Sequence, residues 1–348
     1  MATIKDIARL TGVSTATVSN VLNNKPGAAG PSKTREILDV AESLHYQPNT
    51  LAKNLKQKRT HNIGIITEDL TVFNTPEIVD GIDAYCETNG YEILLTNLRL
   101  FKRYNNDFTD TPGHHELFNS VVRSMAAKQV EGIIYIGYHC REIIYQPTML
   151  NIPFVYAYCF PKNPRYPSVL FDDEKAAYDV TAILIEKGHR NIGIVCGPLV
   201  SNNALCRLNG YQRALYEHGI LYNAATTTYG DWGRKSGYDA ADTLIEKGVT
   251  AIFAFNDMMA SGIYMRCVER GLIIGRDISL FGYDNSELSE SYSPAISSVA
   301  PPLSQMGGKS AELVLSQIRE RSVSSGENEP ILLPCEIHVR GSVGKSVV

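Results

Sequence analysis

Near the start of the chain stands the stretch Thr3-Ile-Lys-Asp-Ile-Ala-Arg-Leu-Thr-Gly-Val-Ser-Thr-Ala-Thr-Val-Ser-Asn-Val-Leu22. Its first half predicts a short helix, because apolar residues recur at helical spacing at Ile4, Ile7, Ala8 and Leu10. Thr3 comes just before this helix and is a residue type that caps helix N-termini. Gly12 then supplies the backbone freedom that a tight turn needs.

The second half of the stretch predicts another short helix. Ser14 is its expected cap, and its inward face consists of Val18, Val21 and Leu22. Two short helices joined by a Gly-containing turn form a helix-turn-helix, whose second helix enters the major groove of DNA with its N-terminal residues. Small, mostly polar side chains cover the outer face of this helix, namely Thr15, Ala16, Thr17, Ser19 and Asn20. The pattern alone fits an ordinary two-helix corner with a solvated face equally well.

The distribution of charge favours a nucleic-acid-binding head. The chain of 348 residues has room for two or three domains and a formal net charge of -4. Residues 1–60 nevertheless carry nine basic and four acidic side chains, a balance of +5, which leaves -9 on the rest. Because neutralisation of phosphates supplies most of the affinity for nucleic acids, a basic head on an acidic body suits DNA binding.

Cysteine usage and hydropathy predict a cytoplasmic protein. The seven cysteines are scattered, odd in number and free of Cys-x-x-Cys pairs, so we expect reduced, buried thiols. No apolar run approaches the roughly eighteen residues of a membrane span, and the first residues lack an apolar signal core.

A third helix and a basic segment complete the N-terminal region. Ser32 can cap the helix, its apolar face is formed by Ile37, Leu38, Ala41 and Leu44, and Pro48 ends it, which gives a head of residues 1–48. Residues 49–60 are rich in lysine and too short for a helix that is stable alone. They are therefore either a plain basic linker or a hinge that folds on DNA and places Leu55 in the minor groove as a wedge.

Several motifs make the sequence resemble the lactose-repressor (LacI) family of bacterial transcription regulators. They are Met-Ala-Thr-Ile-Lys-Asp-Ile-Ala at the start, Gly-Val-Ser-Thr in the turn, Thr-Val-Ser-x-Val-Leu-Asn, and Tyr46-x-Pro48-Asn49 followed by Ala52 and Leu55. Within the family the head is most similar to that of purine repressors, although the loop of residues 25–31 is about two residues longer. The motifs and the resemblance together imply a DNA interface of Thr3, Ser14, Thr15, Ala16, Thr17, Ser19, Asn20, Asn23, Tyr46, Asn49, Ala52, Leu55 and Lys56.

From residue 61 the sequence alternates between short apolar strands and amphipathic helices, which predicts parallel sheets covered by helices. The fold class is therefore α/β: a helix-turn-helix head and hinge, then a two-lobed core of two doubly wound parallel sheets. The resemblance implies a periplasmic-binding-protein-like core over residues 61–348 with three crossings between lobes. We expect the first lobe at about 61–160 and 291–325, and the second at about 161–290 and 326–342, with the second set of strands starting at residue 168.

Polar residues that follow the predicted strands are candidates for binding a small molecule, because ligands of open α/β sheets bind beyond the carboxyl ends of the strands. The resemblance to the LacI family adds Arg207 and Trp232 to these candidates. The candidates are Phe73, Tyr138, Ser201, Asn203, Arg207, Trp232, Asn256, Asp257 and Asp284. Each has a structural alternative: Arg207 can pair with Asp284, Asp257 can cap a helix, and Trp232 can belong to the core. Carboxylates, a guanidinium and a flat ring suit a sugar or sugar derivative, whereas Ser201 replaces an arginine of the purine repressors.

No sequence feature indicates catalysis, a metal or a cofactor. His114-His115-Glu116 lacks the spacing of a helical zinc site, and no nucleophile-elbow, Walker or dinucleotide-binding motif stands between a strand and a helix. We therefore expect a homodimeric or tetrameric repressor whose affinity for double-stranded operator DNA depends on an effector. A solute-binding module without DNA function and a repressor controlled by a partner protein are the alternatives.

Two substitutions separate the roles proposed for the head and the hinge. Asn20→Ala should relax the sequence preference of the DNA-bound protein, because it removes a side chain that can read a base edge. Leu55→Ala should weaken binding to all operators, because the wedge supports the bent DNA whatever its sequence. Footprints on selected DNA measure both effects, and unchanged footprints for both variants would contradict the assignment.

Overall fold

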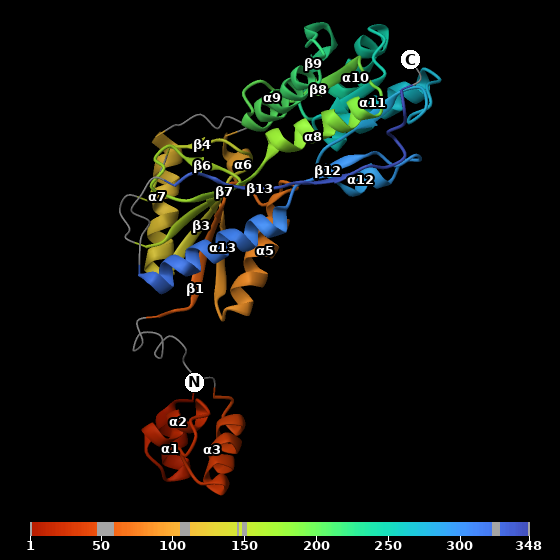
Figure 1. Cartoon of the computed structure of the whole chain (residues 1–348). Helices are drawn as coiled ribbons and strands as arrows, with labels where there is room; N and C mark the ends of the chain where they lie inside the picture. The colour runs from red at the N-terminus through yellow and green to blue at the C-terminus, as the bar shows by residue number, and fades with distance from the viewer. Residues whose placement is uncertain are drawn as a thin grey trace. The chain divides into compact units, whose positions relative to one another are not determined.

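The computed structural model describes residues 2–46, 59–104, 112–144, 146–147, 152–321 and 328–346. Contacts between residues divide the chain into two units, Met1–Thr60 and His61–Val348, and each unit has its own apolar core (Figure 1). Asn49, Ala52, Leu55 and Lys56 of the predicted hinge lie outside the described residues.

The described part of the smaller unit contains the three predicted helices, α1 (Ile4–Thr11), α2 (Thr15–Leu22) and α3 (Pro31–Ser43). Their shared core consists of Ile7, Ala8, Val18, Val21, Ile37 and Ala41. The turn after α1 uses Gly12 in the left-handed region at φ 64°, as its position predicted.

Two apolar residues of the predicted inner faces are instead exposed. Leu10 is 58% exposed and Leu38 is 44% exposed, while Thr11 is buried. The reason is helical geometry: the core face of α1 runs through positions 4, 7, 8 and 11, so that Leu10 lies off the stripe.

The first lobe of the larger unit is built on a parallel sheet in the order β13-β7-β5-β3-β1-β2. Its strands are β1 (Asn62–Thr67), β2 (Glu92–Asn97), β3 (Gly132–Ile136), β5 (Phe154–Ala157), β7 (Ser168–Phe171) and β13 (Ile331–Leu333). Helices α5 (Thr75–Thr88) and α13 (Leu303–Glu320) pack on one face, and α7 (Pro112–Ala127) packs on the other (Figure 1). Strand residues alternate between these faces: Ile134 and Ile136 join the core under α5 and α13, whereas Ile133 and Tyr135 join the core under α7.

The second lobe is built on a smaller parallel sheet in the order β11-β10-β8-β9. Its strands are β8 (Ile192–Cys196), β9 (Thr227–Tyr229), β10 (Ala251–Ala254) and β11 (Ser279–Phe281). Helix α8 (Asp173–Glu186) packs against α9 (Asn202–Glu217), and α10 (Arg234–Glu246) packs against α11 (Asp257–Glu269). The predicted α/β architecture with two parallel sheets is therefore confirmed.

Short elements connect and flank the two sheets. They are α6 (Leu100–Tyr104), β4 (Glu142–Ile143), β6 (Phe160–Pro161), the 3-10 helix Ala224–Thr226, α12 (Glu287–Glu290), β12 (Ser298–Ala300) and β14 (Glu336–His338). Strands β12 and β14 form an antiparallel pair where the chain passes between the lobes (Figure 1).

The predicted boundary between the lobes is wrong at two places. Strand β7, expected to open the second lobe, pairs with β5 through Tyr156 and Ser168 and so belongs to the first sheet. Strand β13, in the segment 326–342 that was assigned to the second lobe, extends the same sheet by pairing with β7. The sequence of a short apolar strand indicates that the strand is buried. It does not indicate which sheet the strand joins, because its pairing partner lies far away in the sequence.

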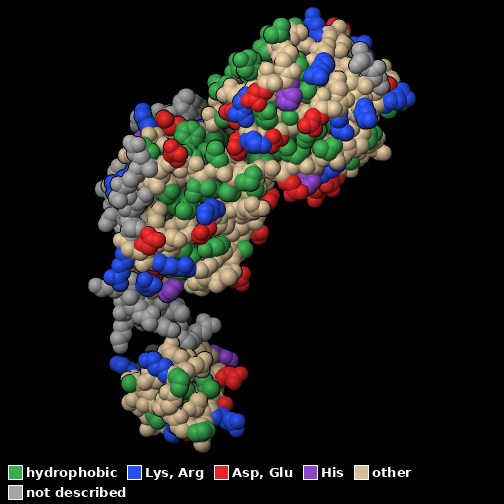
Figure 2. Space-filling model, in the orientation of Figure 1, with side chains coloured by type: hydrophobic (Ala, Val, Ile, Leu, Met, Phe, Trp, Pro, Cys, Tyr) green, Lys and Arg blue, Asp and Glu red, His purple; other side chains and the backbone are tan. Residues whose placement is uncertain are grey.

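Figure 2 shows acidic and basic side chains interspersed over the visible face of the larger unit. Ion pairs one helical turn apart on the surface of this unit include Lys175 with Asp179 and Lys235 with Asp239. Among the residues that the structure describes, no helix combines the length and the apolar character needed to span a bilayer.

Helices α5 and α13 approach each other closely through glycine. A Cβ atom on Gly307 would lie 2.1 Å from the carbonyl oxygen of Ile78, whereas one on the neighbouring Gly308 would lie 3.7 Å from that of Gly81. Gly307→Ala should therefore lower the free energy of unfolding by about 1–3 kcal/mol through overpacking. Gly308→Ala is the matched control and should be neutral or stabilising, since alanine favours helices. Urea denaturation measures both, and equal effects would contradict the close approach.

Candidate functional site

The outer face of α2 leaves three polar side chains available for contact. Thr15 is exposed, Ser19 and Asn20 are half-buried, and none of these side chains makes a hydrogen bond to another described residue. The Ser14 hydroxyl, by contrast, accepts a hydrogen bond from the backbone N–H of Thr17 at 3.0 Å and caps the helix. Ala16 is exposed beside Thr15, so a small surface at the start of α2 is open to a binding partner.

Other predicted DNA-binding residues have structural contacts in the head. Thr3 donates its N–H and its hydroxyl to the carboxylate of Asp6, at 3.0 and 2.7 Å, and so begins α1. The Asn23 amide donates to the carbonyl oxygen of Ser19 at 2.7 Å. Tyr46 packs beside the core of the three helices. These contacts fix the geometry of the head, and the DNA roles of the residues stay predictions.

A buried arginine lies at the C-terminal ends of the second-lobe strands. The Arg207 side chain, on α9, donates from Nε to the carboxylate of Asp173 at 2.6 Å and from Nη1 to the carbonyl oxygen of Phe255. Its guanidinium carbon lies 3.4 Å from the ring centroid of Tyr283 and 5.9 Å from that of Trp232. Burial is the largest single effect on the pKa of Arg207 and lowers it, but the combined attraction of Asp173, Tyr283, Asp284 and Tyr158 raises the pKa overall. The expected alternative, a pair with Asp284, is not the ion pair that forms.

Trp232 and Asp284 complete this group, which we call the Arg207 cluster: Arg207, Trp232, Tyr283 and Asp284. Trp232 has φ 70° and its ring lies where a Cβ atom on Gly197 would be, so glycine at 197 is needed for its position. Asp284 has φ 101°, and burial raises its pKa well above the usual range although Arg207 opposes the shift. The cluster offers a cation, a flat ring and a carboxyl group in one part of the second lobe.

Four other predicted ligand residues are engaged in holding the structure together. Ser201 is the N-cap of α9 and accepts from the backbone N–H of Ala204 at 3.4 Å. Asn203 accepts from the backbone N–H of Cys140 at 3.2 Å and donates to Asp173 at 2.6 Å, which ties the two lobes together.

Asn256, and not Asp257, caps helix α11. Its side-chain oxygen accepts from the backbone N–H of Met259 at 2.8 Å, and its amide donates to the carbonyl oxygen of Trp232 at 2.9 Å. The carboxylate of Asp257 accepts from the backbone N–H and hydroxyl of Ser286, at 2.8 and 3.0 Å, and from the hydroxyl of Ser298 at 2.6 Å. Asn256 therefore positions the tryptophan, and Asp257 holds the loop after β11 against β12.

The first lobe contributes two aromatic residues at the ends of its strands. Phe73 is 61% exposed, and Tyr138 packs edge-on against Phe101 with 4.3 Å between ring centroids. The backbone N–H of Tyr138 donates to the fully buried carboxylate of Glu68 at 2.7 Å.

Glu68 also accepts two 2.6 Å hydrogen bonds from Arg141 and one of 2.5 Å from the Tyr135 hydroxyl. Burial acts to raise the pKa of Glu68, but these donors outweigh it and hold the pKa below its usual value. The bidentate pair with Arg141 therefore stays ionised and fixes the segment that carries Tyr138.

Comparisons with known proteins identify the family. Residues 3–49 match the family of bacterial regulatory proteins called lacI, and residues 181–343 match a periplasmic binding protein-like domain. The HTH-type transcriptional repressor PurR of Vibrio atlanticus is 33% identical over 92% of this chain and 93% of its own length. Catabolite control protein A of Priestia megaterium is 33% identical over 98% of both proteins. The chain belongs to the LacI family.

Solved structures agree with this membership of the LacI family. The lac repressor dimer bound to operator and the anti-inducer ONPF superposes with a TM-score of 0.77 and 25% identity over 98% of both chains. The complex of the regulator CelR with cellobiose has a TM-score of 0.63 and 25% identity over 98% of this chain and all of that one. The protein is thus a DNA-binding transcriptional repressor with an effector-binding core, and not an enzyme.

Sequence reasoning missed three residues at the site of this LacI-family repressor. Asp173, which pairs with Arg207, follows strand β7, so the strand-end rule would have found it if β7 had been placed beside β5. Glu68 directly follows β1, so the same rule applied to it, but it was not among the candidates. No sequence signal linked Tyr283 to Arg207, because a buried tyrosine just after a strand looks the same whether it stacks on an arginine or packs in the core.

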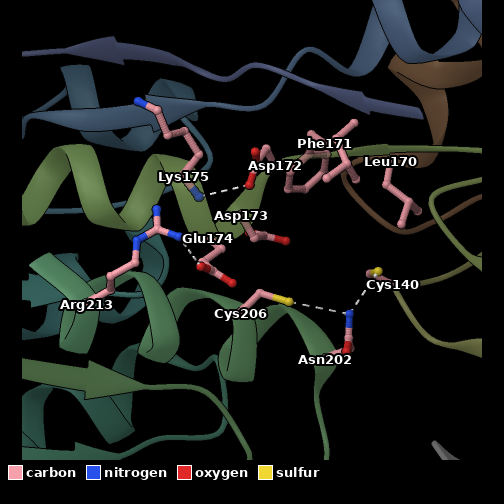
Figure 3. Close-up of a pocket in the computed structure, with 11 residues that line it drawn as sticks. Cys140, Leu170, Phe171, Asp172, Asp173, Glu174, Lys175, Asn202, Cys206 and Arg213 are labelled. Carbon is pink, nitrogen blue, oxygen red and sulfur yellow. Dashed lines mark hydrogen bonds and ion pairs between the residues drawn. The ribbon is translucent and has the colours of Figure 1, made fainter. Parts of the chain in front are cut away.

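A cavity of about 330 Å³ lies next to Asp173, on the side where the chain enters α8 (Figure 3). Its lining consists of Cys140, Leu170, Phe171, Asp172, Asp173, Glu174, Lys175, Asn202, Cys206, Arg213 and Leu332. None of the nine predicted ligand residues is among these described residues. Asp173 therefore lines this cavity and also forms an ion pair with Arg207.

Asp257 should make the stability of the core depend on pH. Burial raises the pKa of Asp257 to about 6, from a usual value of 3.8, despite its three hydrogen bonds. Because the folded state then holds the proton more tightly than the unfolded chain, the contribution of this group to stability is greatest below pH 3.8. It falls as the pH rises towards 6, by about 3 kcal/mol in total.

Urea denaturation of the wild type and Asp257→Asn across this pH range measures that contribution, since the variant cannot titrate. Asp239→Asn, which changes an exposed acid on α10, is the control and should keep the wild-type pH dependence. The prediction is contradicted if Asp257→Asn keeps it as well.

Proposed function

We propose that a neutral sugar or sugar derivative binds at the Arg207 cluster and sets the affinity of this repressor for its operator. The observation that carries the proposal is the position of Arg207 between the rings of Tyr283 and Trp232, with Asp284 beside it. No hydrogen bond joins Nη2 of Arg207 to a described residue, so this nitrogen remains to bind a hydroxyl or carbonyl oxygen. The Trp232 ring suits the apolar face of a sugar ring.

The two lobes provide a means of transmitting the binding event. The cluster belongs to the second lobe, whereas Phe73 and Tyr138 follow strands of the first lobe. An effector that contacts both groups would favour one arrangement of the lobes, and operator affinity would follow if the two arrangements bind DNA unequally. The CelR–cellobiose complex, in a relative of the same fold, supports a sugar as the ligand.

A nucleobase is the second candidate. It is favoured by the PurR repressors among the relatives and by the tryptophan, on which a purine can stack. Ser201 counts against it, because its hydroxyl is occupied in capping α9 where the purine repressors carry an arginine.

A homodimer is the assembly that we propose, as in the lac repressor dimer bound to operator. One face of α11 supports it, because Met258, Met265 and Val268 recur on a helical stripe and are 44%, 41% and 56% exposed. Two heads in a symmetric dimer would recognise the two half-sites of a palindromic operator.

Thermal-shift screening of the full-length protein tests the effector proposal. Neutral sugars should raise the melting temperature of the wild type, by an amount that grows with the logarithm of ligand concentration, and Arg207→Gln should lose the rise. Asp239→Asn is an exposed control outside the cluster and should retain it. A melting temperature raised only by adenine or hypoxanthine would show that the effector is a purine and not a sugar. A rise that persists in Arg207→Gln would show that the effector does not bind at the Arg207 cluster.

The DNA function is measured on the same preparations. Duplexes selected from a random library by the wild type should not be bound after deletion of residues 1–60, and the effector found in the screen should change their affinity for the full chain. Sedimentation velocity should give the mass of a dimer. Binding that survives the deletion, or a monomer at micromolar concentration, would contradict the proposal.

A further inference from the structure

The charge of Arg207 is paired within the protein before any effector arrives. Its Nε lies 2.6 Å from the carboxylate of Asp173, and the two side chains are only 4% and 6% exposed. A pair this close and this dry is electrostatically much stronger than one at the surface. An incoming ligand therefore meets the edge of an ion pair and not an isolated cation.

Asp173 is held in this position from several directions. It is the first residue of α8, directly after the strand that brings the chain from the first lobe. Its second carboxylate oxygen accepts from the amide of Asn203 at 2.6 Å. Since both oxygens have donors and the neighbouring turn is capped by Asp172, the carboxylate cannot swing away from Arg207 without losing two hydrogen bonds.

Further acidic groups surround the same arginine. Asp284 interacts with Arg207 and with Asp257 and Asp173, and its pKa is raised by burial. The basic side chain that interacts with Asp257, Arg340, is committed to Glu290 at 2.8 Å and to Asn285 at 2.6 Å. Two carboxyl groups, of Asp173 and Asp284, thus interact with the Arg207 guanidinium, and Asp257 lies near enough to Asp284 to disfavour its ionisation. The environment therefore disfavours additional negative charge.

We propose that Asp173 is a specificity-determining residue: by pairing with Arg207 it restricts the effector to molecules without negative charge and excludes phosphorylated or carboxylated ones. This inference rests on the proposed effector role of the Arg207 cluster. The groups that remain to bind the ligand are Nη2 of Arg207, the ring of Trp232 and the carboxyl group of Asp284. Together they suit neutral hydroxyl groups.

Inorganic sulfate is a probe that needs no knowledge of the effector. The melting temperature of the full-length chain is measured in sodium sulfate and in sodium chloride of equal ionic strength at pH 7. Sulfate stabilises folded proteins in general, so only the saturable part that depends on Arg207 is relevant. The wild type and Arg207→Gln should respond alike, because the paired arginine does not bind the anion.

Asp173→Asn should gain an anion site. The substitution keeps the size of the side chain and leaves the charge of Arg207 uncompensated, so sulfate should raise its melting temperature by about 2 °C more than that of the wild type. The gain should disappear in Asp173→Asn combined with Arg207→Gln. Glu174→Gln is the matched control, because it removes the adjacent acid, which pairs with Arg213 and not with Arg207, and it should behave like the wild type.

Asp173→Ser is the second variant if Asp173→Asn does not fold, as judged by circular dichroism. It removes the same carboxylate from Arg207 and should give an Arg207-dependent gain as well. An Arg207-dependent sulfate response in the wild type would overturn the proposal, as would folded variants that gain none. Selection of DNA by the same wild-type preparation reports separately on the repressor function, so failure of one proposal is distinguishable from failure of the other.

Discussion

The buried ion pair between Asp173 and Arg207 is the interaction on which the second lobe depends. Asp173 begins α8 and Arg207 lies on α9, and these helices are in contact along their length. Gly210 allows this approach, since a Cβ atom there would lie 2.1 Å from the carbonyl oxygen of Glu174. A buried ion pair costs much free energy in lost hydration, and it is tolerated only where further hydrogen bonds satisfy both partners. Here Asn203 and the Phe255 carbonyl supply them.

The first lobe contains a second buried pair of the same kind, between Glu68 and Arg141. Its role differs, because the guanidinium is bidentate and the carboxylate also accepts from Tyr135 and Tyr138. The pair therefore ties the end of β1 to the segment after β3. The backbone N–H of Cys140, in that same segment, donates to Asn203 of the second lobe. Each side of the lobe boundary is thus held by an ion pair. Hydrogen bonds connect the two sides, since Cys140 donates its N–H to Asn203 and its sulfur accepts from the amide of Asn202 at 3.3 Å.

Hydrogen bonds from neighbouring residues preorganise the Arg207 cluster. Asn256 caps α11 and holds the backbone of Trp232, and Asp257 holds the loop that carries Asp284. Amide and carboxylate side chains at strand ends are consequently of two kinds. Some complete the hydrogen bonding of helix ends and loops, which is obligatory once those ends are buried, and a minority remain to bind other molecules.

The sequence by itself determined the local elements of this protein. Helical spacing, a serine cap and Gly12 are enough for the helix-turn-helix, and continuous apolar runs are enough for buried parallel strands, because these signals act between residues close together in the chain. It also determined the family and the strand ends at which polar residues gather.

Only the tertiary structure decided which sheet β7 and β13 join and that Asp173 is the partner of Arg207. It also decided that Asn256 caps α11 and that Asp257 holds the loop after β11. The physical reason is that pairing across a sheet and burial of charge depend on groups far apart in sequence, whose distance is set by the packing of the whole unit.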